Sequence, residues 1–276
     1  MPDPLNGAAG RRRVFRRLHE SGCFVIPNPW DRGSAAFLVQ LGFRALATTS
    51  AGFAWSLGRR DGGVGLEEAL DHFRDLAAAV PVPVNADFEG GFAVEPERVA
   101  ENVARAAATG VAGLSIEDST GDAAEPLYPF SLAVERVRAA RAAIDASAQA
   151  GEVLLTARSE GFIRGRPDLP ETIRRLTAFA EAGADCLYAP GIRSRAEIEA
   201  VVAAVSPRPV NVLAGDSTTV AELTTLGVRR ISVGGSLARA AWTGFLDAAR
   251  EIAERGTFTS LGRAISGSDL NAKFPG

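Results

Sequence analysis

The sequence predicts an α/β protein, a (β/α)₈ TIM-type barrel with a C-terminal helical extension. Eight short apolar runs alternate with amphipathic segments between Cys23 and Glu254. The runs hold about four to six mostly apolar residues without strict alternation, as in a parallel sheet covered on both faces. Eight strand-then-helix units in one chain favour a closed barrel. A doubly wound open sheet has the same local pattern and is the alternative.

The units follow one another in a regular order. The predicted strands are Cys23–Asn28, Ala45–Thr49, Val82–Asp87, Ala112–Glu117, Glu152–Ala157, Asp185–Ala189, Pro209–Leu213 and Arg229–Val233. The predicted helices are Ser34–Leu41, Leu66–Ala79, Pro96–Thr109, Ser131–Ala146, Pro170–Ala182, Arg195–Val205, Thr218–Leu226 and Leu237–Glu254. A glycine-rich loop is expected between Thr49 and Asp61. We therefore assign residues 1–256 to the barrel, with an N-terminal helix closing its bottom, and residues 257–276 to a tail.

Helix boundaries carry local signals. Pro96 and Pro170 suit the first helical position, and Ser194 with Glu197 has the spacing of a capping box. Glycine, which tolerates the left-handed conformation, follows four predicted helices and predicts their ends. These glycines are Gly42, Gly110, Gly183 and Gly227.

Charge and hydropathy exclude several classes of protein. A net charge of −3 and a pI near 5.6 give no global attraction to nucleic acid or anionic lipid. No apolar run approaches the roughly 20 residues that span a bilayer. The basic stretch Arg11–Arg17 has no apolar signal-peptide core behind it, so an N-terminal helix is favoured over an organellar transit peptide.

Scarce residue types exclude further chemistry. Lys273 is the only lysine and lies near the C-terminus, which argues against a Schiff-base aldolase. His19 and His72, the only histidines, fall in helical segments, which argues against a three-histidine zinc site. Cys23 and Cys186 are isolated cysteines at the bottom rim of the predicted barrel, so neither is an expected nucleophile. They suit a reducing cytoplasm.

Polar residues end nearly every predicted strand, where the chemistry of (β/α)₈ barrels is located. They are Asn28, Thr49–Ser50, Asp87, Glu117–Asp118, Arg158, Ala189–Pro190, Asn211 and Gly234–Gly235. Asp87, Glu117 and Glu89 supply the oxygen ligands that Mg²⁺ or Mn²⁺ prefers, and Asn85 points the same way as Asp87. Such acids would repel one another without a cation. The alternative is structural, with one acid paired to Arg158 and another capping a helix.

Three further features suit anion binding. Arg158 can grip a carboxylate bidentately and neutralise an oxyanion, or serve as a structural partner to the acids. The small-residue loop Thr49–Gly52 could cradle a carboxylate or phosphonate with its amides. Gly234–Gly235 precedes the last helix, where such barrels often bind phosphate; a close backbone approach explains it equally well.

These residues together resemble the isocitrate lyase/phosphoenolpyruvate mutase superfamily. The resemblance covers roughly Phe24 to Ala240 and rests on several motifs in order. They are Ile26–Asp31 (IPNPWD), Gly42–Gly52 (GFRALATTSAG), Leu57–Asp61 (LGRRD), Val84–Asp87 (VNAD), Ser115–Asp118 (SIED) and Ala157–Glu160 (ARSE).

The resemblance implies Mg²⁺ and a small 2-oxo acid or dicarboxylate, with C–C or P–C bonds made or broken through an enolate. It implies that Asp61, Asp87 and Glu117 surround the metal, with Asp61 acting through water. Glu89, two residues after Asp87, is a further candidate ligand by its position. Thr49, Ser50 and Ala51, with Asn211 nearby, would hold the substrate, and Arg158 its carboxylate or enolate oxygen. It also implies a homo-oligomer, a dimer or tetramer in which the tail packs on a neighbouring subunit.

Two departures from the family pattern limit what carries over. The first acid of the family's Asp-x-Asp pair is Asn85 here, which shifts the expected direct metal contact to Asp87 or Glu89. The loop Ser119–Tyr128 lacks the lysines, cysteine and histidine of the isocitrate-cleaving members, and the mutase's lysine. The proton donor is therefore open among Asp118, Asp122, Glu160, Tyr188 and water.

The favoured function is thus a Mg²⁺-dependent lyase or hydrolase acting on a 2-oxo acid or its adduct, with Arg158, Asp118 and Glu160 as the expected catalytic residues. A phosphonate or phosphosugar enzyme using Gly234–Gly235 is one alternative. A 2-oxo acid binding protein or sensor without catalysis is the other.

Overall fold

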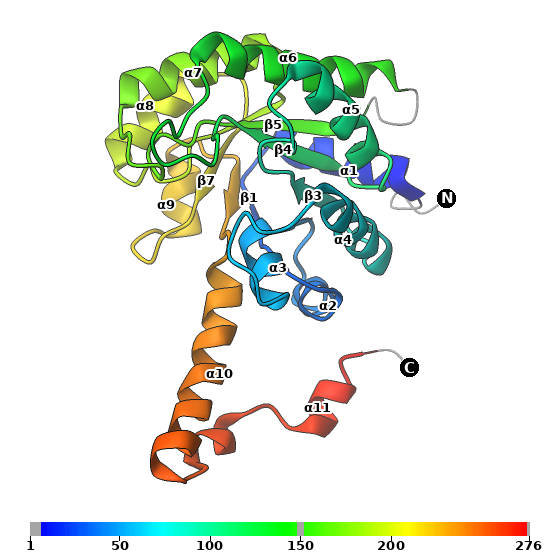
Figure 1. The fold of residues 1–276 in the computed structure, drawn as a ribbon, viewed down its shortest axis with the longest axis vertical. Coiled ribbons are helices and arrows are strands. Elements are labelled where there is room, and N and C mark those ends of the chain that lie inside the picture. Colours follow the sequence, from blue (N-terminus) through cyan, green and yellow to red (C-terminus); the bar gives the residue numbers. More distant parts are fainter. Residues whose placement is uncertain (1–6, 148–151, 275–276) are drawn as a thin grey trace.

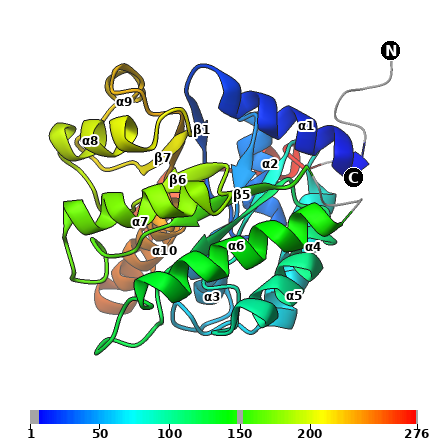
Figure 2. The same cartoon turned by 90° about the horizontal axis from the view of Figure 1, so that it is seen from above.

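The computed structural model describes residues 7–147 and 152–274 and contains a (β/α)₈ barrel (Figures 1 and 2). Eight parallel strands lie in the order β1-β8-β7-β6-β5-β4-β3-β2. The Ala47 amide donates to the Pro27 carbonyl at 3.1 Å and brings the two edge strands together. The barrel prediction is confirmed, and the open-sheet alternative is wrong. The strands are β1 (Phe24–Ile26), β2 (Leu46–Ala47), β3 (Val84–Asp87), β4 (Gly113–Glu117), β5 (Leu154–Arg158), β6 (Cys186–Tyr188), β7 (Val210–Leu213) and β8 (Arg230–Ser232).

Helices follow or precede each strand, and most of them surround the barrel (Figures 1 and 2). They are α1 (Gly7–Glu20), α2 (Arg32–Gln40), α3 (Ser50–Ser56), α4 (Leu66–Ala79), α5 (Pro96–Ala107), α6 (Phe130–Ala146), α7 (Leu169–Glu181), α8 (Arg195–Val205), α9 (Val220–Thr225) and α10 (Ser236–Arg255), followed by a 3₁₀ turn η1 (Thr259–Arg263) and α11 (Gly267–Asn271). The Ser194–Glu197 capping box is present, and the four predicted glycine ends all have positive φ. Residues 1–6 of the predicted barrel domain and 275–276 of the predicted tail lie outside the described residues.

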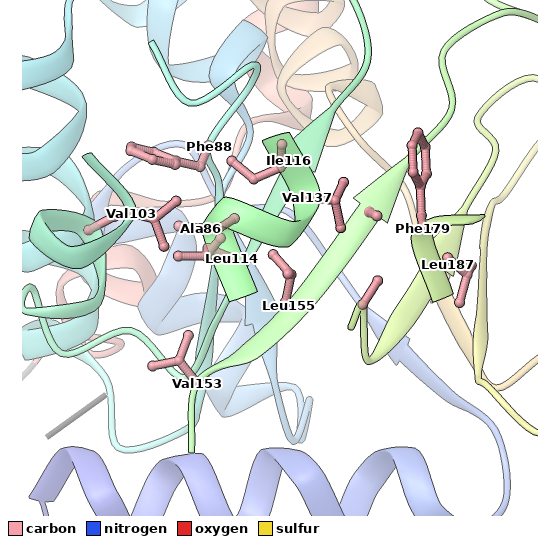
Figure 3. Packing of buried hydrophobic residues seen from close by; sticks show 14 of the residues in the cluster. Ala86, Phe88, Val103, Leu114, Ile116, Val137, Val153, Leu155, Phe179 and Leu187 are labelled. Carbon is pink, nitrogen blue, oxygen red and sulfur yellow. The ribbon is translucent and has the colours of Figure 1, made fainter. Parts of the chain in front are cut away.

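The core lies between strands and helices. Leu114 and Ile116 of β4 and Leu155 of β5 point outward, toward side chains such as Val103 and Val137 of the surrounding helices (Figure 3). Polar residues occupy inward positions of several strands. They include Asn85, Ser115, Thr156, Asn211, Arg230 and Ser232. The barrel wall is therefore apolar on its outer face, and its interior has polar residues above an apolar lower end.

Helix α1 closes the bottom of the barrel, as predicted. Phe15 is fully buried in a cluster with Phe24, Leu154 and Cys186 at the lower end of the strands. The Arg16 guanidinium donates to the carbonyls of residues 152 and 153 and pairs with Asp185 at 3.2 Å. The chemistry therefore belongs at the opposite, open end.

One predicted loop is a helix. Residues Ser50–Ser56 form α3, whose first turn is capped by the Thr49 hydroxyl, which accepts from the Gly52 amide at 3.2 Å. The prediction of a loop at Thr49–Gly52 was wrong because a seven-residue helix shows too little periodicity to be seen in a sequence. The small residues allow close packing instead: a Cβ at Gly52 would lie 3.1 Å from Trp30.

Helix α10, which follows the last strand, leaves the barrel. Helix α10 projects away from the strands, and the chain returns through η1 and α11 (Figure 1). Helix α10 carries exposed apolar side chains, and that of Phe245 is 60% exposed. In the returning segment, the Phe274 ring packs edge-on against the Phe37 ring of α2, with the ring centroids 5.3 Å apart. The predicted packing of this arm on another subunit stays a prediction. Among the helices of the described residues, none has both the length and the apolar character that crossing a membrane demands.

Candidate active site

Two adjoining cavities open at the carboxyl end of the strands. The first, of about 160 Å³, descends into the barrel, and the second, of about 690 Å³, lies beneath the loops that follow β3, β4 and β5. Ser50, Asp61, Arg158 and Ile163 line both. Asp87, Asn211 and Ala51 line the first, and Glu89, Glu117 and Glu160 line the second. The structure thus brings most predicted site residues to one place.

Asp87 is held from two sides. Its Oδ2 accepts hydrogen bonds from the Ser50 amide at 3.0 Å and the Ser50 hydroxyl at 2.9 Å. Its Oδ1 accepts from Arg158 Nη1 at 2.7 Å. The Asp87 carboxylate therefore accepts from the first amide of helix α3, which is one of those that have no partner within the helix.

Arg158 bridges the acids. Its guanidinium lies 2.7 Å from Asp87, 3.3 Å from Glu117 and 2.9 Å from Glu160. The strand register places Asp87 opposite Ser115 rather than Glu117, so the two acids meet through Arg158. These three carboxylates hold the pKa of Arg158 well above its usual range despite burial. The ion pairing that was the structural alternative is thus present.

Glu117 and Glu160 are buried carboxylates. Burial, followed by the charge of Glu160, raises the pKa of Glu117 to about 8, while Arg158 and Arg164 oppose the rise. Glu160 has no exposed surface, and its Oε2 has no hydrogen-bond partner among the described residues, although Arg164 Nε lies at 3.7 Å. Together with Asp87, these acids make three carboxylates beside two arginines.

Glu89 and Asp61 stand at the rim of the cavities. Burial and then the charges of Asp87 and Asp61 raise the pKa of Glu89 to about 7. Its backbone has φ of 47°, and its carbonyl accepts from the Glu117 amide at 3.0 Å. The left-handed backbone, unusual outside glycine, sets the position of this carboxylate.

Asp118 lies outside the lining of both cavities. One oxygen accepts from the Glu160 amide at 2.8 Å and the other pairs with Arg175 at 3.2 Å. Burial raises its pKa to about 6. Asp118 therefore fixes the backbone that carries Glu160. Asp122 is exposed and accepts from the Ala124 amide, whereas Tyr188, with a pKa raised to about 12 by burial, lines the first cavity.

The other residues predicted to bind the ligand are engaged in contacts within the protein. Asn211 donates to Ser232 and accepts from Arg230. The Gly234 amide donates to Asn28 at 2.8 Å, and a Cβ at Gly235 would lie 3.0 Å from the Trp55 ring. At Gly234–Gly235 this geometry favours close backbone approach over a phosphate site.

The histidines and cysteines are not among the residues that line the two cavities. Burial lowers the pKa of His19 to about 3 and that of His72 to about 4. Burial raises the pKa of the Cys23 and Cys186 thiols. These groups are neutral at physiological pH.

The donor chemistry fits a hard divalent cation. In the described residues no group of three or more His, Cys, Asp or Glu side chains is close enough to form a complete protein cage. Mg²⁺ does not require one, because it is usually held by one or two carboxylates and keeps several waters. The raised pKa values of Glu89 and Glu117 and the unpartnered Oε2 of Glu160 mark carboxylates that a cation would satisfy.

The loop between β4 and α6 closes on itself. Ser119 and Leu127 form an isolated antiparallel bridge, and the Thr120 amide donates to the Pro126 carbonyl at 3.0 Å. Ser119, Thr120 and Tyr128 line the second cavity. None of the residues from 119 to 128 is a lysine, cysteine or histidine.

Several cavity residues were missed by sequence reasoning. Ser115, Arg230 and Ser232 line the first cavity, and Arg164 lines the second. The signal that could have found the first three is the polar residue at every second position of the predicted strands. Arg164 lies in the loop after β5, where no periodicity exists.

Comparison with known proteins gives concordant matches. A family model described as phosphoenolpyruvate phosphomutase matches residues 15–253. An uncharacterized protein of Mycobacterium tuberculosis is 32% identical over 262 residues, covering 94% of this chain and 95% of its own length.

Solved structures agree with that match. A candidate lyase/mutase from Burkholderia cenocepacia J2315 is 49% identical, with 96% of each chain covered and a TM-score of 0.92. Oxaloacetate acetylhydrolase in complex with the product oxalate is 27% identical, covering 95% of this chain and 93% of that one, with a TM-score of 0.84. The 2,3-dimethylmalate lyase, a superfamily member, is 26% identical, covering 96% and 93%, with a TM-score of 0.83.

Proposed function

Because the chain belongs to the phosphoenolpyruvate phosphomutase family, we propose that it is a Mg²⁺-dependent lyase or hydrolase. It would break the C–C or P–C bond of a small 2-oxo acid or its adduct and leave an enolate. The observation that carries this proposal is the Arg158 guanidinium within 3.3 Å of Asp87, Glu117 and Glu160 at the cavity mouth. Structural relatives that act on oxaloacetate and dimethylmalate support it.

Asp87 would hold the cation, with Glu117, Glu89 and Asp61 acting directly or through water. Mn²⁺ has the same oxygen preference and could replace Mg²⁺. When bound, the cation supplies Lewis-acid polarisation of the 2-oxo group. The Ser50 amide and hydroxyl fix the orientation of Asp87, which presents its Oδ1 toward Arg158 and the cavity.

Arg158 would stabilise the negative charge that develops on the enolate oxygen. Its position is fixed by carboxylates on three sides, so little reorganisation accompanies the reaction. Thr49, Ser50 and Ala51, at the start of α3, line the first cavity and would contact the substrate's acid group there.

A proton on the leaving side can come from Glu160 or Tyr188, because each lines a cavity. Tyr188 keeps its hydroxyl proton at neutral pH since burial raises its pKa to about 12. Asp118 acts through the backbone of Glu160 and is a positioning residue.

The test is turnover across a panel of acids with Mg²⁺ or with a chelator. Oxaloacetate, methylisocitrate, 2,3-dimethylmalate and phosphonopyruvate differ in the bond that would break. Mg²⁺-dependent formation of a 2-oxo acid or oxalate from one of them would support the proposal. Turnover that a chelator leaves unchanged would contradict it. Binding of these acids without turnover would favour the non-catalytic binder, which the missing lysine, cysteine and histidine in residues 119–128 would suit.

The apparent affinity for Mg²⁺ should rise with pH up to about 8. The pKa values of Glu89 and Glu117 are raised, to about 7 and about 8, so both are protonated below those values in the metal-free protein. A cation must displace each proton whose carboxylate it uses, which costs roughly tenfold in affinity per pH unit per proton. Calorimetric titration of Mg²⁺ with oxalate present, from about pH 6 to 9, would measure this. Glu89→Gln should remove the lower step, and a flat profile would contradict the assignment.

Further features of the proposal concern the cell and the assembly. We place the protein in the cytoplasm, supported by two free cysteines. We also propose a homo-oligomer in which the exposed apolar side chains of α10 meet a second copy; Trp242 and Phe245 are among them. Besides the cation and a second copy of the chain, the small acid is the proposed partner.

A further inference from the structure

Arg230 is a buried cation inside the barrel. It begins β8, faces inward and is only 4% exposed. Its Nε donates to Asn211 Oδ1 at 2.8 Å, its Nη2 donates to Thr156 Oγ1 at 3.0 Å, and its Nη1 lies 3.4 Å from His19 Nε2. It lines the first cavity, which descends from the mouth.

None of these partners carries negative charge. His19 Nδ1 lies 2.8 Å from the Phe15 carbonyl, which can only accept, so this nitrogen carries the proton and Nε2 offers a lone pair to Arg230. Among the described residues no carboxylate lies within ion-pair distance of Arg230. By contrast, the half-buried Arg158 and the buried Arg175 both have carboxylate partners. The buried Arg136 donates to the carbonyls of residues 90, 93 and 94, and of Arg136 and Arg230 only Arg230 lines the first cavity.

A buried guanidinium without a carboxylate is costly, because desolvation is not offset by an opposite charge. Arg230 has five N–H groups and uses three on protein atoms, which leaves two for another partner. Asn85 lines the same cavity, is 4% exposed, and its Oδ1 has no hydrogen-bond partner within the described chain. The Asn85 oxygen can only accept and therefore calls for a donor such as water, whereas the remaining N–H groups of Arg230 are donors that an acidic group can accept from.

We propose that Arg230 binds a second acidic group of the ligand, at the inner end of the cavity beneath the mouth. Thr156, which accepts from Arg230, precedes Arg158 by two residues on β5. The Arg230 position therefore lies about 7 Å below the Arg158 position along the strand. A diacid of four or five carbons is comparable in length. The cavity, at about 160 Å³, is smaller than the usual ~300–1,000 Å³ of ligand pockets and would admit only such small molecules.

This inference rests on the proposed function, since the first acid group is the one held at the mouth. It makes Arg230 a specificity determinant: the enzyme should prefer a 2-oxo acid that carries a terminal carboxylate over the same chain ending in a methyl group. A free inorganic anion is the other source of the same chemistry, and the experiment below separates the two.

The experiment compares matched ligands by calorimetry with Mg²⁺ present. The pairs are 2-oxoglutarate with 2-oxovalerate and oxaloacetate with 2-oxobutyrate, and oxalate serves as a probe of the mouth alone. In the wild-type protein the diacid of at least one pair should bind at least about tenfold more tightly, the size expected for one charge-assisted hydrogen bond. Arg230→Met should bring that ratio to within about twofold of unity, and Arg230→Lys should restore part of it.

Two further variants keep the test decisive. Arg229→Met removes the same charge from the adjacent residue, whose guanidinium bonds the Gly22 carbonyl outside the cavity, and should keep the wild-type ratio. If Arg230→Met does not fold, Asn211→Asp decides, because it sets a carboxylate against Arg230 Nε with almost no change in size. Loss of the preference in that variant supports the inference.

The outcomes separate this inference from the function beneath it. No Mg²⁺-dependent binding of oxalate to the wild-type protein would overturn the proposed function and this inference together. Oxalate binding with no preference for the diacid in either pair, or a preference that survives Arg230→Met, would overturn this inference alone. Arg230-dependent binding of inorganic phosphate or chloride without a diacid preference would replace it with a free-anion site.

Discussion

Replacing Asp87 by alanine should abolish Mg²⁺-dependent binding of 2-oxoglutarate and of the enolate mimic oxalate. Asp87 is the carboxylate that α3 and Arg158 orient toward the cavity, so its loss removes the main charge that would hold the cation. Since even outer-shell groups cost 10–100-fold in metal affinity, we expect a loss of at least about a hundredfold. Isothermal calorimetry with and without Mg²⁺ measures it.

Two variants separate metal binding from folding. Asp87→Asn keeps the shape and the two hydrogen bonds from Ser50, so it should stay folded and still lose the cation. Asp75→Ala removes an exposed aspartate paired with Arg32 on the barrel surface and should bind oxalate as the wild-type protein does. Unchanged oxalate binding by Asp87→Ala would refute the site.

Arg158→Lys should lower kcat by about two to three orders of magnitude, the effect of removing one preorganised oxyanion donor. Lysine keeps the charge but presents a compact ammonium that cannot reach three carboxylates at once. Arg158→Met removes the charge and leaves buried acids unpaired, so we expect unfolding to become easier by about 3–5 kcal/mol. Steady-state kinetics on the active acid of the panel and urea unfolding test the two effects.

Arg164→Met provides the graded comparison. Arg164 lies 3.4 Å from Glu117 and 3.7 Å from Glu160 but is 40% exposed and does not reach Asp87. The fall in kcat caused by Arg164→Met should be at least about tenfold smaller than the fall caused by replacing Arg158, because water screens the charge of Arg164. Equal losses at Arg158 and Arg164 would mean that general charge, rather than the position of Arg158, matters.

The fold was predictable because its signals are local. Pro96, the Ser194–Glu197 box and the glycines after helices set boundaries that the structure reproduces. Helix α3 and the outward course of α10 were not predictable. The first is too short for periodicity, and the second has no local signal in the sequence, although it leaves Trp242 and Phe245 exposed.

The site was predictable in its location more than in its contacts. The ends of parallel strands gather at one rim, which placed Asp87, Glu117 and Arg158 together. Sequence could not show that Asp118 turns away to Arg175, since β4 ends at Glu117 and alternation no longer applies beyond it. The sequence also did not single out Arg230. An arginine beside a short apolar run is normally assigned to the start of the strand, and only the three-dimensional structure shows that this one points into the barrel.

The most direct measurement is a crystal structure of the protein with Mn²⁺ and oxalate, using the anomalous signal of Mn²⁺ to place the ion. The account predicts an anomalous peak bonded to an Asp87 oxygen at roughly 2.0–2.2 Å, near the distances known for Mg²⁺. It also predicts oxalate between that ion and Arg158. An ion bound away from Asp87 and Glu117, or oxalate bound there with no ion, would contradict it.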